Sequence, residues 1–282
     1  MKKFISLLLP FILFLLFTGF HIGMLRFPLS NQKTPLVIAH RGDSVHAPEN
    51  SLAAFDLALS QGADGIELDV RSSKDNIPVV FHDASLRRIF FHNLYVEDLT
   101  FSQLHQSEFF TGTGDLNTIC SLEDVLLLCR SYPNTRIVMD LKVGGMEQKV
   151  VSLIEKYDLC SQCEIASEHP EILYKIKIKN PNLKTILLLS SAGSVFSYRR
   201  LGGGCLTETS LGLPSVFFPD GISARHLYIT NALIQYAHAR NQYVYAWTAN
   251  KTTTINRLHH LGADGIITDT PSEAVRYIYA DH

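Results

Sequence analysis

The chain has 282 residues, of which 46% are hydrophobic, and this is enough for one large buried core. Its 25 basic and 27 acidic residues nearly balance, and no dense run of Lys or Arg is present, so we expect no nucleic-acid partner. The odd number of cysteines, five, gives no clean framework of paired disulfides.

The N-terminal segment, residues 1–25, consists of Met, two lysines and an apolar stretch. An apolar helix of ~20 residues is long enough to span a bilayer. Because no small-x-small cleavage site follows, we expect a retained transmembrane anchor, with a cleaved signal as the alternative. The two lysines indicate a cytosolic N-terminus, so the rest of the chain is expected to be membrane-anchored and extracytoplasmic. A cleaved segment would instead give a secreted or periplasmic protein.

After a short linker at 26–35, strand-like and helical runs alternate through the remaining domain, 36–282. The strand-like runs are Leu36–His40, Gly65–Val70, Pro78–His82, Arg136–Lys142, Cys163–Ser167, Lys184–Ser190, Gly221–Ala224, Tyr243–Thr248 and Gly265–Asp269. Helical spacing lies between most of them, for example at Ser51–Gln61 and Met146–Tyr157. Repeated strand–helix units predict an α/β fold with a parallel sheet, and at this length a TIM (β/α)8-like barrel.

Two features do not fit a regular barrel. Nine strand-like runs exceed the eight strands of such a fold. The link from Val70 to Pro78 is too short for a helical crossover, which takes about a dozen residues, so we expect a hairpin-like excursion there. The stretch at about 84–120 has no clear periodicity, and we expect a small insertion after the third strand, over the barrel mouth.

The sequence Gly-Ala-Asp-Gly-Ile occurs twice, at Gly62–Ile66 and at Gly262–Ile266. Each copy follows a helical run and leads into a strand. We therefore expect Gly62 and Gly262 to end their helices in the left-handed conformation that glycine favours.

Carboxylates stand near the ends of two predicted strands. Glu67 and Asp69 are two residues apart, so their side chains lie on the same side of one strand. Asp140 comes near the end of another strand, and strand ends meet at one rim of a barrel. Three converging carboxylates favour a hard divalent cation, Mg²⁺ or Ca²⁺. The alternative is a set of solvated rim acids.

Two histidines and two cations also stand at predicted strand ends. His40 and His82 are candidates for a general acid and base, since imidazole exchanges protons near neutral pH. Arg41 and Lys142 are expected to bind an anionic group such as phosphate. Taken singly, each is better explained by a structural histidine or a surface ion pair, but their shared position favours a site.

Three further residues have more than one interpretation. Asn50 is expected to cap the helix that follows it, with a place in the site as the alternative. Trp247, the only tryptophan, ends a late strand and is predicted either to wall a substrate pocket or to pack in the core. Asp269 also ends a strand, and with Pro271 nearby it is equally well placed to cap the last helix.

Taken in order, these motifs resemble the glycerophosphodiester phosphodiesterase family. The matching segments are Ala39-His40-Arg41-Gly42, Pro48-Glu49-Asn50-Ser51, Gly62-Ala63-Asp64, Glu67-Leu68-Asp69-Val70, His82-Asp83, Trp247-Thr248-Ala249-Asn250 and Gly262 to Asp269. The resemblance spans about residues 36–275. It implies a TIM barrel and metal-dependent hydrolysis of glycerophosphodiesters to an alcohol and sn-glycerol 3-phosphate.

By position, the resemblance makes Glu67 and Asp69 metal ligands, His40 and His82 the acid/base pair, and Arg41 a phosphate ligand. It also implies that the glycerol 2-hydroxyl attacks phosphorus and that water then opens a cyclic phosphate.

Two positions depart from the family pattern. The family usually has Glu-Leu-Lys where this chain has Asp140-Leu141-Lys142, and Asp is shorter by one bond of roughly 1.5 Å. The family's Ser-Phe is replaced by Ser167-Glu168, which adds a charge near the mouth. These changes put the identity and affinity of the metal, and the choice of substrate, in question.

Two other functions remain open. The same chemistry permits a lysophospholipase D that acts on lysophospholipids, and the same fold permits an inactive binding module. For a lipid substrate, apolar residues of the insertion are expected to contact the acyl chain: Phe90, Phe91, Leu94, Phe109 and Phe110.

Overall fold

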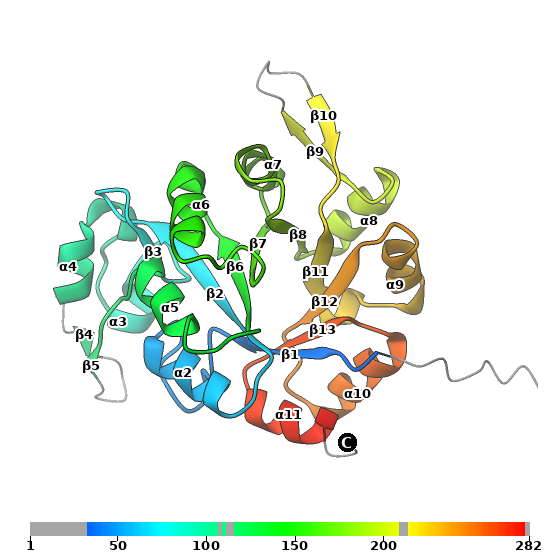
Figure 1. The fold of residues 1–282 in the computed structure, drawn as a ribbon, viewed down its shortest axis with the longest axis horizontal. Coiled ribbons are helices and arrows are strands. Elements are labelled where there is room, and N and C mark those ends of the chain that lie inside the picture. Colours follow the sequence, from blue (N-terminus) through cyan, green and yellow to red (C-terminus); the bar gives the residue numbers. More distant parts are fainter. Residues whose placement is uncertain (1–32, 107–108, 111–115, 209–213, 280–282) are drawn as a thin grey trace, which may run out of the picture. The chain divides into compact units, whose positions relative to one another are not determined.

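A computed structural model describes residues 33–106, 109–110, 116–208 and 214–279 (Figure 1). The predicted anchor at 1–25 and most of the linker at 26–35 lie outside the described residues. None of the helices in the described ranges combines the length and the apolar character that a membrane crossing requires.

A closed ring of parallel strands forms the centre of the described part (Figure 1). Within it, eight strands follow the order β1, β13, β12, β11, β8, β7, β6, β2, and β2 pairs again with β1. They are β1 (Leu36–His40), β2 (Gly65–Ser72), β6 (Arg136–Leu141), β7 (Cys163–Ser167), β8 (Lys184–Leu189), β11 (Gly221–Arg225), β12 (Tyr243–Trp247) and β13 (Gly265–Thr268). The predicted TIM-barrel fold is confirmed.

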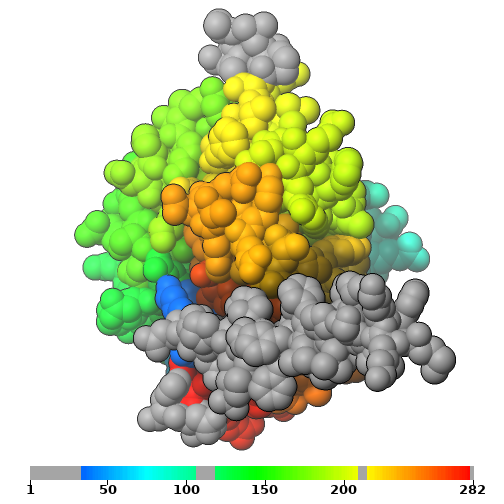
Figure 2. Space-filling view, turned by 90° about the vertical axis from the view of Figure 1, so that its right-hand side faces the viewer, coloured from blue at the N-terminus to red at the C-terminus, as the bar shows by residue number. Residues whose placement is uncertain are grey.

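Helices cover the outside of the ring (Figure 1). They are α2 (Leu52–Ser60), α5 (Leu122–Cys129), α6 (Glu147–Lys156), α7 (Pro170–Lys179), α8 (Ala192–Arg200), α9 (Asn231–His238), α10 (Thr252–Leu261) and α11 (Pro271–Tyr279). Figure 2 shows the side of the later units, where the yellow to orange segments lie side by side on one face. Because both faces of each strand are covered, the strand sequences are nearly continuous apolar runs.

Two apolar clusters hold the barrel together. The larger one lies between strands and helices, where residues such as Ile66 of β2 and Phe55 of α2 are fully buried. The smaller one includes Ile38, Ile186 and Ile267 on alternate positions of the strands. Successive strand residues point to opposite sides, so the residue two positions after an inward-facing one also faces the barrel interior.

The ninth strand-like run is not a barrel strand. β3 (Pro78–Val80) pairs antiparallel with β2, and Val70 lies opposite Val80, which confirms the predicted hairpin. The strand also ends earlier than predicted. His82 is therefore placed by the turn after β3 and not by the end of a barrel strand.

The insertion after β3 contains short elements of its own. They are α3 (Arg87–Phe90), the 3-10 helix η1 (Val96–Asp98), α4 (Phe101–Gln106) and the antiparallel pair β4 (Phe109–Phe110) and β5 (Leu116–Asn117). Leu86, Leu104 and Ile119 form a separate small core beneath them with Val79 of β3. The absence of a periodic sequence pattern is explained by the shortness of these elements.

Among the insertion residues that were expected to meet an acyl chain, Phe90 is only 3% exposed and packs in this small core. Its prediction is wrong, because a buried ring cannot contact a ligand from solvent. Phe91 and Leu94 are exposed, at 73% and 44%. The side chains of Phe109 and Phe110 lie outside the described residues.

A second hairpin and a short 3-10 helix were not predicted. β9 (Cys205–Glu208) and β10 (Pro214–Phe217) pair antiparallel between α8 and β11. The 3-10 helix η2 (His226–Tyr228) follows β11.

The repeated Gly-Ala-Asp-Gly-Ile segment performs the same local task twice. Gly62 and Gly262 have positive φ values of 90° and 87°, as predicted for residues that end a helix. Asp64 and Asp264 each accept a hydrogen bond from a backbone amide of a neighbouring strand, at 2.7 and 2.8 Å. The repeat therefore ends a helix and attaches the following turn to the sheet.

Candidate active site

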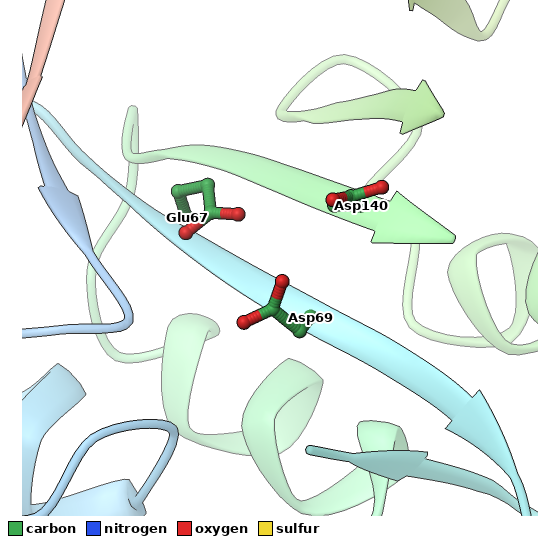
Figure 3. A group of neighbouring side chains, drawn as sticks. All are labelled: Glu67, Asp69 and Asp140. Carbon is green, nitrogen blue, oxygen red and sulfur yellow. The ribbon is translucent and has the colours of Figure 1, made fainter. Parts of the chain in front are cut away.

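Three buried carboxylates converge from two neighbouring strands, β2 and β6 (Figure 3). Glu67 and Asp69 come from β2, and Asp140 lies directly opposite Asp69 on β6. One oxygen of each residue lies within 4.8 Å of the others. The shorter side chain of Asp140 thus still reaches the cluster, and hard oxygen ligands in this arrangement fit a divalent cation.

Two cationic side chains partly neutralise these acids. Lys142 Nζ lies 2.8 Å from Asp69 Oδ1 and also contacts Asp140 Oδ2. Arg41 Nε forms an ion pair with Asp69 Oδ2 at 3.0 Å. Neither cation forms an ion pair with the Glu67 side chain among the contacts of the described residues. Glu67 is consequently the carboxylate of the cluster that neither Lys142 nor Arg41 neutralises directly.

The pKa values reflect this unequal compensation. Burial and the charge of Asp69 raise the pKa of Glu67 to about 7. Burial also acts to raise the pKa of Asp69, but Lys142 and Arg41 outweigh it and hold that pKa at about 2. For Asp140, burial prevails over Lys142, and the pKa rises to about 6. Repulsion among buried carboxylates is the condition under which a divalent cation is most favourable.

His40 lies beside the acids at the end of β1. Its Nδ1 is 2.6 Å from Asp269 Oδ1, and its Nε2 is 4.0 Å from Glu67 Oε2. Burial lowers the pKa of His40, but the hydrogen bond to Asp269 and the charge of Glu67 outweigh it, so the pKa is raised. A proton on Nδ1 satisfies Asp269 and leaves Nε2 as the ring atom for proton exchange.

His82 has the same kind of partner. Its Nδ1 is 2.6 Å from Asp83 Oδ1. Burial lowers the pKa of this ring, against the opposing charge of Asp69 and the hydrogen bond to Asp83. Both histidines are therefore oriented by an aspartate on Nδ1, and this leaves Nε2 of each ring for chemistry.

One cavity of about 130 Å³ is lined by all the predicted site residues: His40, Arg41, Glu67, Asp69, His82, Asp140, Lys142 and Trp247. Its other lining residues are Val138, Ala166, Glu168, Leu188, Ser223 and Ile267. Trp247 at the end of β12 lines the pocket and also packs against the inner apolar cluster, so both of its predicted roles fit the structure. The exposed Glu168 also lines this cavity, so the added charge noted in the sequence lies at the site.

The predicted capping role of Asn50 is wrong. Ser51, and not Asn50, caps α2 by accepting a hydrogen bond from Ala54 N at 3.1 Å. Asn50 instead donates from Nδ2 to Asp69 Oδ2 at 2.9 Å and accepts from Asp69 N at 3.2 Å. It has a positive φ of 59°, a conformation that asparagine tolerates better than most residues.

Asp269 binds side chains of the site. Besides His40, it accepts a hydrogen bond from Asn250 Nδ2 at 2.6 Å. Its side chain is therefore committed to orienting the histidine and not to capping α11. The signal was its position at the end of a strand, within the Thr-Asp-x-Pro run that ends the resemblance.

An ion-pair chain connects the insertion to the site. Arg88 of α3 donates to Glu49 Oε1 at 2.7 Å and to Asp83 Oδ2 at 2.5 Å. Glu49 in turn accepts from Arg41 Nη1 at 2.9 Å. Arg88 therefore holds the carboxylate behind His82 and the carboxylate behind Arg41, and no sequence motif indicated this role.

The sequence profile of the Glycerophosphoryl diester phosphodiesterase family matches residues 40–273. A glycerophosphodiester phosphodiesterase of Caldanaerobacter subterraneus subsp. tengcongensis is 30% identical over 251 residues, which cover 86% of this chain and 97% of the relative. The lysophospholipase D GDPD1 of Rattus norvegicus is 28% identical over 270 residues, which cover 86% and 85%.

Solved structures share the fold. An Oleispira antarctica phosphodiesterase in complex with the product sn-glycerol-3-phosphate superimposes with a TM-score of 0.72 at 24% identity, covering 87% of this chain and 97% of the neighbour. A glycerophosphodiester phosphodiesterase from Agrobacterium tumefaciens gives 0.69 at 21% identity, covering 88% and 100%. At these identities the likeness supports the barrel architecture alone.

Proposed function

The chain belongs to the glycerophosphoryl diester phosphodiesterase family, and from this premise we propose how its residues divide the hydrolysis of glycerophosphodiesters. The products of this reaction are an alcohol and sn-glycerol 3-phosphate. The observation that carries the proposal is the convergence of two aspartate-oriented histidines and three buried carboxylates on one cavity.

The carboxylates of Glu67, Asp69 and Asp140 would hold the divalent cation, either Mg²⁺ or Ca²⁺. Their oxygens are hard ligands, they lie within 4.8 Å of one another, and neither Lys142 nor Arg41 pairs with Glu67 among the contacts of the described residues. When bound, such a cation neutralises phosphoryl oxygens and acidifies a neighbouring hydroxyl.

His40 and His82 form the general acid/base pair. One imidazole accepts the proton of the attacking hydroxyl, and the other donates a proton to the oxygen of the departing alcohol. Water then reopens the cyclic phosphate that the glycerol 2-hydroxyl has formed, with the two proton transfers reversed. Asp269 and Asp83 keep each ring in the tautomer that directs Nε2 to the reaction.

Arg41 and Lys142 contribute the positive charge that the phosphate needs. Both line the cavity and already lie against Asp69, so their side chains are ordered before a substrate enters. Trp247 closes the opposite side as a flat wall for the substrate. The presence of every one of these groups disfavours an inactive binding module.

Lysophospholipase D activity is the second candidate. Its support is a relative of that name and the exposed side chains of Phe91 and Leu94 on the insertion. The N-terminal apolar segment at 1–25 would bring such an enzyme to a membrane and place the barrel outside the cytoplasm. Membrane fractionation with alkaline extraction tests this anchoring, and recovery in the soluble fraction would contradict it.

The activity is tested with the full chain on glycerophosphocholine, glycerophosphoethanolamine and lysophosphatidylcholine. Released sn-glycerol 3-phosphate and released choline are measured before and after EDTA, and again after Mg²⁺ or Ca²⁺ is restored. We expect hydrolysis of the water-soluble diesters, loss with EDTA, and recovery with one of the two cations.

A matched control keeps this experiment interpretable. His82→Ala should remove turnover, whereas His92→Ala, a change in the insertion at a histidine that does not line the cavity, should retain it. Circular dichroism verifies that both variants fold. Turnover that survives both EDTA and His82→Ala would contradict the proposed roles.

A further inference from the structure

One polar group of the cavity has no role in the proposed hydrolysis. Ser223 of β11 is completely buried and lines the cavity. Its hydroxyl has no hydrogen-bond partner within the described ranges. A buried hydroxyl without a partner costs free energy, so a barrel interior retains one where a ligand completes the bond.

The position of Ser223 in the ring is defined by the strand order. β11 is the fourth strand from β2 in either direction around the eight-stranded ring of described strands. It therefore faces β2, which carries Glu67 and Asp69, across the barrel. A substrate whose phosphate lies at the acids can extend from there toward Ser223.

Apolar side chains lie beside Ser223 in the cavity lining. Leu188 and Ile267 line the same cavity, and Leu188 is the register partner of Ser223 on β8. Trp247, which also lines the cavity, carries a second buried polar atom, Nε1, without a hydrogen-bond partner among the residues the structure describes. The wall thus offers two unpaired polar atoms in apolar surroundings, a pattern suited to a small polyol.

We propose that Ser223 binds the free terminal hydroxyl of the glycerol group and so selects substrates whose glycerol carries no acyl chain. This inference rests on the proposed function. The glycerol 2-hydroxyl must stay beside phosphorus, so the terminal hydroxyl is the group that reaches the far wall. An ester at that position removes the hydroxyl proton and adds a chain that the closed barrel wall does not admit.

Binding of two small phosphates tests this directly. The full chain, with Mg²⁺ or Ca²⁺ present, is titrated calorimetrically with sn-glycerol 3-phosphate and with its 2-hydroxypropyl phosphate analogue, which lacks the terminal hydroxyl. Wild type should bind the analogue roughly 10-fold more weakly, a loss typical of one hydrogen bond. Ser223→Ala should bind both ligands equally, at the affinity of wild type for the analogue.

The control is Thr207→Val. Thr207 on β9 is also buried with an unpaired hydroxyl in the described part, but it does not line the cavity. This variant should keep the 10-fold preference for sn-glycerol 3-phosphate. Thermal denaturation should show Ser223→Ala at least as stable as wild type, since it loses no internal hydrogen bond.

Turnover of glycerophosphocholine distinguishes a failure of the Ser223 role from a failure of the proposed hydrolase function. If Ser223→Ala keeps the wild-type preference for sn-glycerol 3-phosphate, the role of Ser223 is overturned, whatever the turnover. If the preference disappears in Ser223→Ala but wild type turns over no diester, the role of Ser223 holds and the proposed function is overturned. If wild type prefers neither ligand, the role of Ser223 is overturned as well.

Discussion

Asp269 lies 2.6 Å from Nδ1 of His40, although the two residues are 229 positions apart in the chain. This contact joins the last barrel strand to the first and orients the ring toward the acids. It also raises the pKa of His40, together with the charge of Glu67, against the effect of burial.

The first prediction is that Asp269→Asn lowers kcat/KM for glycerophosphocholine by about 100-fold, because the imidazole loses its tautomer control. Removing the carboxylate lowers the pKa of His40, so the limb of the pH–rate profile that reports this ring should shift to lower pH. The measurement is kcat/KM across pH 5 to 9 under a fixed cation concentration.

The control for this prediction is His238→Asn. His238 Nε2 pairs with Asp264 at 2.7 Å, which makes it a similar histidine–aspartate pair outside the cavity. Its variant should keep the wild-type pH profile. A profile that moves equally in both variants would mean that the effect is not specific to His40.

The second prediction concerns the insertion. Arg88→Ala should reduce kcat by about 10-fold, since residues that support the groups in contact with a substrate typically contribute 10- to 100-fold. Asp83 and Glu49 each lose the ion pair with Arg88, so the carboxylates that contact His82 and Arg41 are no longer fixed from behind. Steady-state kinetics on glycerophosphocholine measure the loss.

Arg87→Ala provides the comparison, because Arg87 is the exposed neighbour in the same short helix. It should leave kcat unchanged. An equal loss in both variants would indicate that α3 had unfolded, and no loss in Arg88→Ala would exclude a positioning role for the insertion.

The barrel could be predicted because its signals are local. Each strand is a short apolar run, and Gly62 and Gly262 mark two helix ends by a backbone conformation that glycine adopts readily. The same local reasoning could not place β9, β10 or the insertion elements. Those segments are too short to show periodicity, and they are held by tertiary packing, such as that of Leu104 with Val79 and of Phe217 with Tyr174 of α7.

The site could also be predicted only in part. Residues that end strands are brought together by the fold itself, so His40, Glu67 and Asp140 could be assigned to one rim. The partners that orient them could not, because these contacts depend on how distant loops meet. Asn50 had an obvious local explanation as a cap, and Ser223 carried no motif.

A third prediction addresses the turn after β1. Gly42 has a φ of +83°, and a Cβ there would lie 2.5 Å from Ala54 C. Gly42→Ala should therefore destabilise the fold by roughly 3 kcal/mol, from backbone strain and overlap together. Because the turn carries His40 and Arg41, kcat/KM should also fall by about 100-fold in the folded fraction.

Gly145→Ala separates strain from overlap. Gly145 has a φ of +95°, but a Cβ there would meet nothing within 4 Å. Its variant should lose roughly 1 kcal/mol and retain activity. Urea denaturation monitored by circular dichroism gives both free energies of unfolding, and equal losses would show that the overlap with Ala54 is relieved at no cost.

The fourth prediction is a pH-dependent gain in stability when Glu67 is neutralised. In the metal-free protein, burial and Asp69 raise the pKa of Glu67 to about 7 from an ordinary value of 4.5. The stability linked to this group is therefore complete below pH 4.5 and is lost as the pH rises through about 7. Glu67→Gln cannot ionise, so its free energy of unfolding should exceed that of wild type by roughly 2 kcal/mol at pH 8.

Urea denaturation in EDTA from pH 5 to pH 8 checks this, with Glu171→Gln as a control at an exposed carboxylate of α7 that does not line the cavity. The gain of Glu67→Gln over wild type should be larger at pH 8 than at pH 5, and the control should show no such trend. When the cation is restored, wild type should gain more stability than Glu67→Gln, because the stabilisation by a ligand that binds the folded state grows with the logarithm of its affinity. An equal gain in both proteins would place the cation away from Glu67.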